Sequence, residues 1–245
     1  MTQRARLALA AAVVALLGGA LLLLGFAKSA PPMPAERPVG QRPGLMLLTT
    51  LPILFAEQLT LDAPASPALQ ALQSRYRVVP ISVAAADELG SRRLLLMAQP
   101  QAQPAEALVD LDAWVRRGGR VLLLADPALE WQSQRPLGDR LRPPPSFADT
   151  GLLGHWGLRL EPPEAAGPAS TTVEDRKVRT LAPGTLVASG ACKTAAQGLI
   201  ARCRLGSGEA TVIADADLLN VQATGEGSEA GNLGLLLDEL ARLEQ

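Results

Sequence analysis

The sequence predicts an α/β domain with a mostly parallel sheet, preceded by one N-terminal transmembrane helix. Three observations support this. Leu7–Ala27 is an uncharged apolar run of 21 residues. Residues 93–125 contain an apolar strand, an amphipathic helix, a glycine turn and a second apolar strand, which is the order of a βαβ unit. At the C-terminal end, the leucines of Asn232–Leu243 recur at i, i+3, i+4 and i+7, which predicts a closing helix.

The apolar run Leu7–Ala27 is long enough to cross a bilayer, since 21 helical residues extend about 30 Å. Arg4 and Arg6 precede it, and the first acid of the chain is Glu36. This asymmetry predicts a cytoplasmic N-terminus, a single pass through the bacterial inner membrane and a C-terminal domain in the periplasm. A cleaved signal peptide is the alternative. The run is longer than a typical signal h-region, and Lys28-Ser29-Ala30-Pro31 offers no clean cleavage motif.

Three segments follow from this assignment: an anchor over residues 1–28, a proline-rich linker over 29–43 and a periplasmic α/β domain over 44–245. The linker holds five prolines, which favour an extended, semi-rigid spacer.

The first half of the domain alternates strands and helices. Gly44–Thr50 is a short apolar run, typical of a buried strand. Ser66 and Pro67 predict the start of a helix, because a serine N-cap followed by proline at the first helical position is a common helix opening. Tyr76–Val83 predicts a second strand, which Pro80 places at its end or at a sheet edge.

The clearest unit joins strands Arg93–Ala98 and Arg120–Ala125 through a helix over Pro104–Arg117 that Gly118-Gly119 ends. This unit implies parallel strands and a right-handed crossover. Residues Pro127–Phe147 lack periodicity and predict a long loop. Short strands follow, at Gly157–Glu161, Val173–Leu181, Thr185–Ser189, Leu199–Arg204 and Ala210–Ala214.

The composition argues against nucleic-acid binding. Arg4, Arg6 and Lys28 are three of the 23 basic residues, whereas all 24 acidic residues follow Lys28, so the exported part is net negative. Binding to nucleic acid requires clustered lysine and arginine. Aromatic residues make up only 3% of the chain, which leaves little for stacking platforms.

Cys192 and Cys203 are the two cysteines of the chain. In an oxidising periplasm they can close a disulfide across a hairpin, and two reduced, half-buried thiols are the alternative. A zinc site is not expected, because His155 is the one histidine and there is no CxxC motif.

Polar residues gather at the predicted carboxyl edge of the sheet, where open α/β sheets bind ligands. Thr49 and Thr50 end the first strand, and Asp126 and Asp215 each follow a strand; Asp217 lies two residues further on. These residues predict a site for a small ligand or a divalent cation. The alternative is structural: the three aspartates start turns and cap backbone N–H groups, and the two threonines belong to a simple turn.

No complete catalytic constellation is present, and no cofactor is expected. Cys192 lacks the second glycine of a nucleophile turn, and His155 precedes it in the chain. The turn Gly206-Ser207-Gly208 lacks the lysine and the helix of a phosphate loop. Trp131, Trp156 and the loop Arg135–Arg142 are a candidate contact surface for another protein, with a solvated loop as the alternative.

Two blocks carry a family resemblance, RRLLLMAQPQAQPAEALVDLDAWVRRGGRVLLLADP and RLGSGEATVIADADLLN. They resemble GldG-like auxiliary domains of uncharacterised ABC transport systems and related membrane-anchored domains of unknown function. The resemblance implies a flavodoxin-like, three-layer fold of the class I glutamine amidotransferase type, without the catalytic residues, and work beside a transporter.

We therefore expect a non-catalytic accessory domain that contacts the lipid bilayer through Leu7–Ala27 and binds a membrane protein partner, a transporter subunit. The alternative is a small-ligand or metal-binding domain that uses the carboxyl edge of the sheet.

Overall fold

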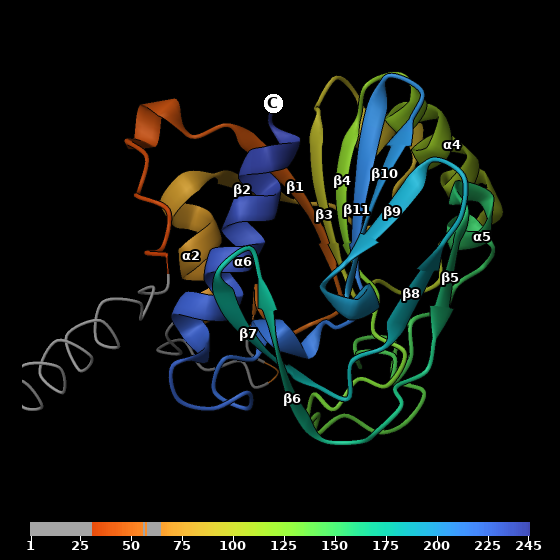
Figure 1. The fold of residues 1–245 in the computed structure, drawn as a ribbon. Coiled ribbons are helices and arrows are strands. Elements are labelled where there is room, and N and C mark those ends of the chain that lie inside the picture. The colour runs from red at the N-terminus through yellow and green to blue at the C-terminus, as the bar shows by residue number, and fades with distance from the viewer. Residues whose placement is uncertain (1–30, 56, 58–64) are drawn as a thin grey trace, which may run out of the picture. The chain divides into compact units, whose positions relative to one another are not determined.

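A seven-stranded sheet runs through the centre of the protein, with helices on both faces (Figure 1). The structure, a computed structural model, describes residues 31–55, 57 and 65–245. Residues 32–245 form one compact unit. The predicted anchor Leu7–Ala27 lies outside the described residues. Among the residues that the structure does describe, no helix is long and apolar enough to cross a bilayer.

Four of the six strand pairings in the sheet are parallel and two are antiparallel, which confirms the prediction of a mostly parallel sheet. In spatial order they are β2 (Arg77–Pro80), β1 (Gly44–Thr49), β3 (Leu94–Ala98), β4 (Arg120–Leu124), β11 (Gly208–Ile213), β10 (Ile200–Leu205) and β9 (Cys192–Ala195). With β11 as the fifth parallel strand, the order is the 2-1-3-4-5 order of flavodoxin-like folds. Strand β2, which ends at Pro80, lies at the sheet edge, as proline at that position indicates.

Each face of the sheet is covered, so the domain has three layers (Figure 1). On β1, Leu45 and Leu47 face one hydrophobic core, and Met46 and Leu48 face the other. This alternation is why the strands are apolar throughout. Helices α2 (Pro67–Arg75) and α6 (Ser228–Leu243) cover the first face; α4 (Ala105–Arg116) and α5 (Leu152–Trp156) cover the second.

The start of α2 and the end of α4 follow the predicted local signals, whereas α6 begins at Ser228, four residues before the predicted Asn232. Ser66 Oγ accepts a hydrogen bond from Leu69 N–H at 3.1 Å, and Pro67 occupies the first position of α2. Helix α4 ends before Gly118, whose φ of +110° suits glycine. The sequence missed the one-turn helix α3 (Ala86–Leu89) and helix α5, because neither is long enough to show periodicity.

The predicted single strand Val173–Leu181 is wrong. The segment belongs to a hairpin of β6 (Pro168–Val173) and β7 (Arg176–Leu181), joined by a two-residue turn. Both turn residues, Glu174 and Asp175, have positive φ, at +48° and +69°. Such turns usually carry Asn-Gly or Asp-Gly, so this one has no sequence signature.

Two more β elements complete the long insertion between β4 and β11. Strands β5 (Leu158–Glu161) and β8 (Thr185–Ala188) pair antiparallel, and the 3-10 turn η2 (Ala196–Gly198) lies in the same insertion. Two other 3-10 turns lie outside it, η1 (Val39–Gln41) before β1 and η3 (Asp217–Leu219) after β11. Strand β9 was not predicted. Cys192 of β9 lies directly opposite Cys203 of β10, and the two form a disulfide.

The second part of the predicted linker lies against the domain. Arg176 Nη2 donates a hydrogen bond to Pro32 O at 3.1 Å, and Arg37 N–H donates to Ser74 O at 2.9 Å. Arg37 also forms an ion pair with Glu244 at 2.9 Å. The chain from Pro32 onward is therefore held by α2, β7 and the end of α6.

Candidate functional site

The structure brings the five predicted ligand-binding residues to one edge of the sheet. Thr49 ends β1, Asp126 follows β4 and Asp215 follows β11, and these strands lie within the parallel part of the sheet. The carboxyl ends of parallel strands meet at the same edge, so the sequence argument places these residues together correctly.

The two threonine hydroxyl groups are engaged with the backbone. Thr49 Oγ1 donates to Ala98 O at 2.8 Å and accepts from Leu51 N–H at 3.0 Å. Thr50 Oγ1 donates to Gln99 O at 2.5 Å. These bonds fix the turn after β1 against the end of β3.

Gln99 is a polar residue of this edge that the sequence analysis missed. It is fully buried with φ of +43°. Its Oε1 accepts from Asp126 N–H at 2.9 Å, and its Nε2 donates to Asp126 O at 3.1 Å and to Pro144 O at 3.0 Å. Gln99 directly follows the predicted strand Arg93–Ala98, and a polar residue at the carboxyl end of a strand is a signal that could have found it.

Asp126 and Asp215 are fully buried and cap backbone donors. Asp126 accepts from Ala128 N–H and Ala216 N–H, both at 2.8 Å. Asp215 accepts from Leu181 N–H at 3.1 Å and from Leu218 N–H at 2.6 Å. Each carboxylate therefore joins segments far apart in the sequence, which is the structural role left open by the sequence.

Asp217 is buried as well, but one of its oxygens differs from the others. Oδ2 accepts from Glu130 N–H at 2.7 Å. Oδ1 is buried and has no hydrogen-bond partner among the residues that the structure describes. A buried, unpaired carboxylate oxygen is costly, and a proton on the carboxyl group reduces that cost.

The pKa values of all three aspartates are raised. Burial raises the pKa of Asp215 well above its ordinary value, and the nearby charges of Asp126 and Asp217 add to this. Burial likewise raises the pKa of Asp126, against the lowering effect of its backbone hydrogen bonds. For Asp217, burial is again the main cause and the pKa is about 7.

The predicted loop after β4 closes this edge. Leu129 N–H donates to Pro145 O at 2.9 Å, and Phe147 N–H donates to Asp126 O at 2.6 Å. With the Glu130–Asp217 bond, these contacts hold the loop over the aspartates. No group of three or more acidic, histidine or cysteine residues in the described part of the chain has the arrangement of a metal site.

His155 and Cys192 do not form a catalytic pair. Cys192 is in the disulfide with Cys203. His155 Nε2 instead lies 3.4 Å from Asp112 Oδ2 and 3.3 Å from Arg116 Nη2. Burial opposes the charge on Asp112, but hydrogen bonds from Arg116 and Trp156 outweigh it and lower the pKa of that carboxyl group.

The prediction that Trp156 belongs to a contact surface is wrong, because its side chain is buried. Trp156 is 2% exposed, because its ring belongs to the core under α5, and its Nε1 donates to Asp112 Oδ1 at 3.0 Å. Trp131 packs partly against the other core. Within the loop Arg135–Arg142, Arg135 pairs with Asp139 at 3.7 Å.

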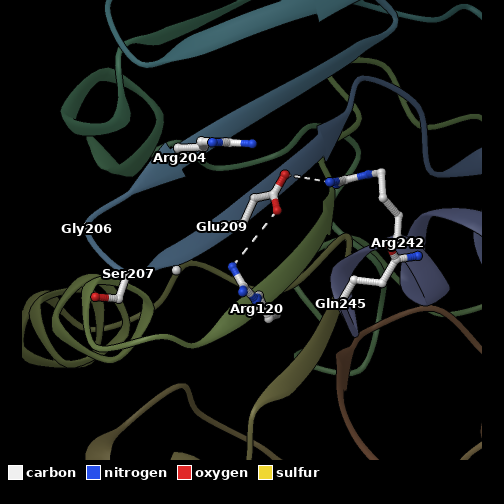
Figure 2. Close-up of a pocket in the computed structure, with 8 residues that line it drawn as sticks. Arg120, Arg204, Gly206, Ser207, Glu209, Arg242 and Gln245 are labelled. Carbon is white, nitrogen blue, oxygen red and sulfur yellow. Dashed lines mark hydrogen bonds and ion pairs between the residues drawn. The ribbon is translucent and has the colours of Figure 1, made fainter.

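Two cavities lie at the opposite, amino edge of the sheet. One, of about 450 Å³, lies between the starts of β4 and β11 and the end of α6 (Figure 2). The other, of about 400 Å³, lies at the starts of β1, β2 and β3. Arg120 and Gln245 line both.

Gly206 and Gly208, which do not complete a phosphate-loop motif, form the β10–β11 turn beside the first cavity. Gly206 has φ of +61°, and a Cβ atom on Gly208 would lie 1.9 Å from Val115 O. Both glycines are thus required by close packing on the end of α4.

Comparison with known proteins gives a family. A model described as an ABC-type uncharacterized transport system matches residues 42–177. No curated protein matches the chain.

Among the solved structures that resemble this chain, two illustrate the shared fold. An exo-beta-1,4-mannosidase, Op5Man5, from Opitutaceae bacterium strain TAV5 has a TM-score of 0.51 at 16% identity; the match covers 81% of this chain and 36% of the mannosidase. The chain therefore spans about a third of that enzyme's length. The cytoplasmic protein STM3548 from Salmonella typhimurium has a TM-score of 0.52 at 10% identity. This match covers 82% of this chain and 98% of STM3548.

Proposed function

Because the chain belongs to the ABC-type uncharacterized transport system family, we propose that it is a non-catalytic accessory component of an ABC transporter, anchored in the inner membrane with its α/β domain in the periplasm. The family match over residues 42–177 is the observation that carries this proposal. It covers β1 to β4, whose carboxyl edge holds the residues that an enzyme or a ligand-binding domain of this fold would use.

The state of that edge supports an accessory role. Hydrogen bonds to backbone groups occupy the side-chain oxygens of Thr49, Asp126 and Asp215, and the loop after β4 covers these residues. The paired Cys192 is not a nucleophile. In this proposal the domain acts by binding or positioning a membrane protein partner. The narrower resemblance to GldG-like domains with an amidotransferase-like fold is part of the same proposal.

The anchor and the compartment are tested by cysteine labelling. The two natural cysteines are paired in a disulfide, so a maleimide reacts with an introduced cysteine and not with them. Leu137→Cys, at a position that is 82% exposed, should react with a membrane-impermeant maleimide in intact spheroplasts. Thr2→Cys should react only after lysis. Labelling of both in intact spheroplasts, or release of the chain into the soluble periplasmic fraction, contradicts the anchored arrangement.

The accessory role is tested by affinity capture of the full chain from gently solubilised membranes, with an unrelated single-pass periplasmic protein as control. Recovery of a permease or an ATPase in constant proportion to the chain supports the proposal. Recovery of the chain alone counts against it.

The small-ligand alternative has one observation in its favour, the unpartnered Oδ1 of Asp217. A ligand or cation that binds there stabilises the native state. A melting temperature raised by Mg²⁺ or Ca²⁺ in the wild type, and unchanged by them in Asp217→Asn, would support this alternative.

A further inference from the structure

The amino edge of the sheet carries a row of arginines. Arg120 of β4 lies opposite Leu94 of β3 on one side and Glu209 of β11 on the other, and Glu209 lies opposite Arg204 of β10. Arg93 immediately precedes β3. Arg77 opens β2, five strand spacings from β10. At roughly 4.8 Å per spacing, the row extends about 24 Å.

Six arginines and two glutamates are the charged side chains that line the two cavities of this edge, here called the arginine groove. The arginines are Arg77, Arg92, Arg93, Arg120, Arg204 and Arg242. This local excess of positive charge contrasts with the net negative charge of the exported part of the chain.

Both glutamates are already engaged. Glu209 pairs with Arg242 at 2.5 Å and with Arg120 at 3.9 Å. Glu244 pairs with Arg37 at 2.9 Å and accepts a hydrogen bond from the hydroxyl of Tyr76.

Three arginines of the groove therefore have side chains without a partner among the described residues. Within the described residues, the side chains of Arg77, Arg93 and Arg204 have no ion pair or hydrogen bond, and all three residues are exposed. A guanidinium group offers five N–H donors in a planar fork, which matches a carboxylate or a phosphate.

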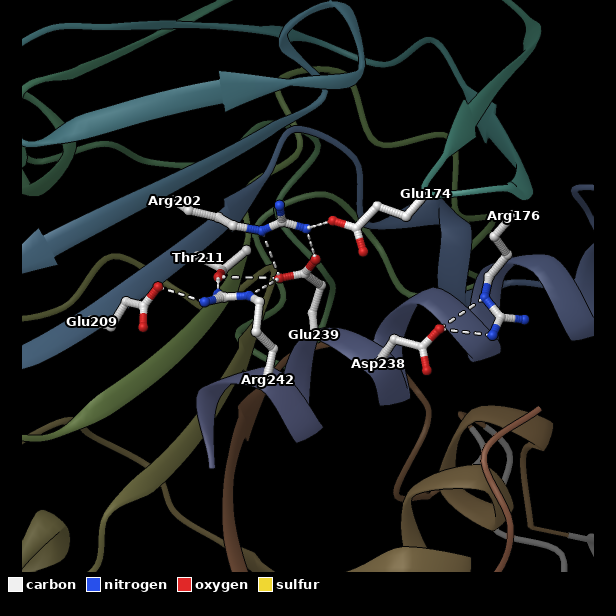
Figure 3. Close-up of polar contacts among 8 residues, drawn as sticks. All are labelled: Glu174, Arg176, Arg202, Glu209, Thr211, Asp238, Glu239 and Arg242. Carbon is white, nitrogen blue, oxygen red and sulfur yellow. Dashed lines mark hydrogen bonds and ion pairs between the residues drawn. The ribbon is translucent and has the colours of Figure 1, made fainter. Parts of the chain in front are cut away.

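One wall of the groove is held rigidly in place. Arg242 of α6 donates from Nε to Glu239 at 3.0 Å and contacts Thr211 and Glu209 (Figure 3). Glu239 is 2% exposed and also binds Arg202. Because Glu239, Glu209 and Thr211 hold Arg242 in place, this wall of the groove stays fixed when a ligand enters, which lowers the entropic cost of binding.

The shape of the groove and its place favour an extended peptide over a lipid headgroup. A row of about 24 Å matches about seven residues of extended chain. The compact unit begins at Pro32, whose carbonyl oxygen accepts a hydrogen bond from Arg176. Arg176 also donates to Ala230 O, so Pro32 lies near the first turn of α6. Arg242 lies in the last turn of that helix, about 18 Å further along its axis. The groove thus lies at the far end of α6 from Pro32, the first residue of the compact unit.

We propose that the arginine groove binds an extended acidic segment of the protein partner, through carboxylates paired with Arg77, Arg93 and Arg204. This inference rests on the proposed accessory function and names the chemistry of the contact. Exposed charge pairs of this kind give modest affinity, fast association and strong dependence on salt.

The test uses the full chain in a non-ionic detergent and a fluorescent decapeptide of glutamate, with a decapeptide of glutamine as the neutral control. We expect the acidic peptide alone to raise the anisotropy, and the affinity to fall as chloride is added. The variant Arg93→Gln/Arg204→Gln should bind about tenfold more weakly, since two exposed charge pairs are lost. Neither substitution leaves an unpaired carboxylate.

The matched control is Arg140→Gln/Arg159→Gln, which removes the same charge at exposed positions outside the groove. It should bind like the wild type. Equal weakening in both double variants would mean a general charge effect and would overturn the proposal, as would absence of binding. Displacement of the peptide by inorganic phosphate, far beyond that by chloride at the same ionic strength, would assign the groove to a phosphate ligand instead.

The affinity capture experiment separates this inference from the function on which it rests. If Arg93→Gln/Arg204→Gln still recovers the transporter subunits in the wild-type proportion, the groove is not the contact and the accessory role stands. If the wild type recovers no transporter subunit, the accessory role fails whatever the peptide does.

Discussion

Asp126 accepts a hydrogen bond from Ala216 N–H at 2.8 Å, and this bond joins the end of β4 to the end of β11 across 90 positions of sequence. These are neighbouring parallel strands, so the carboxylate stands where a ligand would bind in related folds. It is used instead to close the edge. The polar residues of this edge thus hold the domain together, and the arginine groove lies at the opposite edge.

The stability of the domain should fall as the pH rises from about 4 to 8. Asp217 has a pKa of about 7 in the folded protein against about 3.9 when unfolded, so the folded state holds the proton more tightly. That stabilisation is complete below pH 4 and is lost as the pH rises through 7. The shift of about three pKa units corresponds to about 4 kcal/mol at most.

Asp217→Asn tests this directly. We expect the difference in melting temperature between pH 5 and pH 8 to shrink in this variant, because the substituted side chain does not titrate. Asp126 and Asp215 retain part of the dependence, since the pKa values of both are raised in the same direction. The exposed Asp87→Asn is the control. An unchanged pH profile in Asp217→Asn would contradict the assignment.

The disulfide should contribute about 2–4 kcal/mol to the free energy of unfolding, because it closes a loop in the unfolded chain. Cys192→Ser/Cys203→Ser is expected to unfold at correspondingly lower denaturant concentration, and reductant should lower the midpoint of the wild type but not of the variant. Alkylation of both cysteines under native, non-reducing conditions would show that the bond is absent.

Glu239 should be far more important for stability than Glu174, although both bind Arg202. Glu239 is 2% exposed and also binds Arg242, so Glu239→Ala leaves two arginines without their buried partner (Figure 3). We expect a loss of about 3–5 kcal/mol. Glu174, on the β6–β7 turn, has a side chain that is 69% exposed, and Glu174→Ala should cost less than about 1 kcal/mol. Equal effects in urea unfolding would contradict the network.

Gly208→Ala should destabilise the domain strongly, since the added Cβ would lie 1.9 Å from Val115 O. Gly154 in α5 is the matched control, because nothing lies within 4 Å of a Cβ placed there. Gly154→Ala should leave the melting temperature unchanged or raise it. Comparable melting temperatures for the two variants would argue against the close packing of this turn.

The sequence predicted the parallel core well, because apolar runs such as Arg120–Ala125 and the helix before it carry strong local signals. It placed Thr49, Asp126 and Asp215 at one edge for the same reason. It did not decide whether those side chains bind a ligand or cap the backbone. That depends on partners such as Ala216 N–H and Leu181 N–H, which are distant in sequence and supplied by the fold.

The insertion between β4 and β11 was harder to predict. The hairpin around Glu174-Asp175 lacks the usual turn residues, and β9 is a polar edge strand without an apolar pattern. The arginine groove had no local signature, because Arg77, Arg93, Arg120 and Arg204 become neighbours only through the strand register.

The measurement that tests the central claim most directly is cross-linking in intact cells, before any detergent is added. A photoreactive amino acid replaces Arg204 in the groove, or Arg159 outside it, in the full chain, and the products are purified under denaturing conditions and identified by mass spectrometry. The account predicts a covalent adduct with an ABC transporter subunit from position 204 and little or none from position 159. Recovery of the unattached chain from both positions would contradict it.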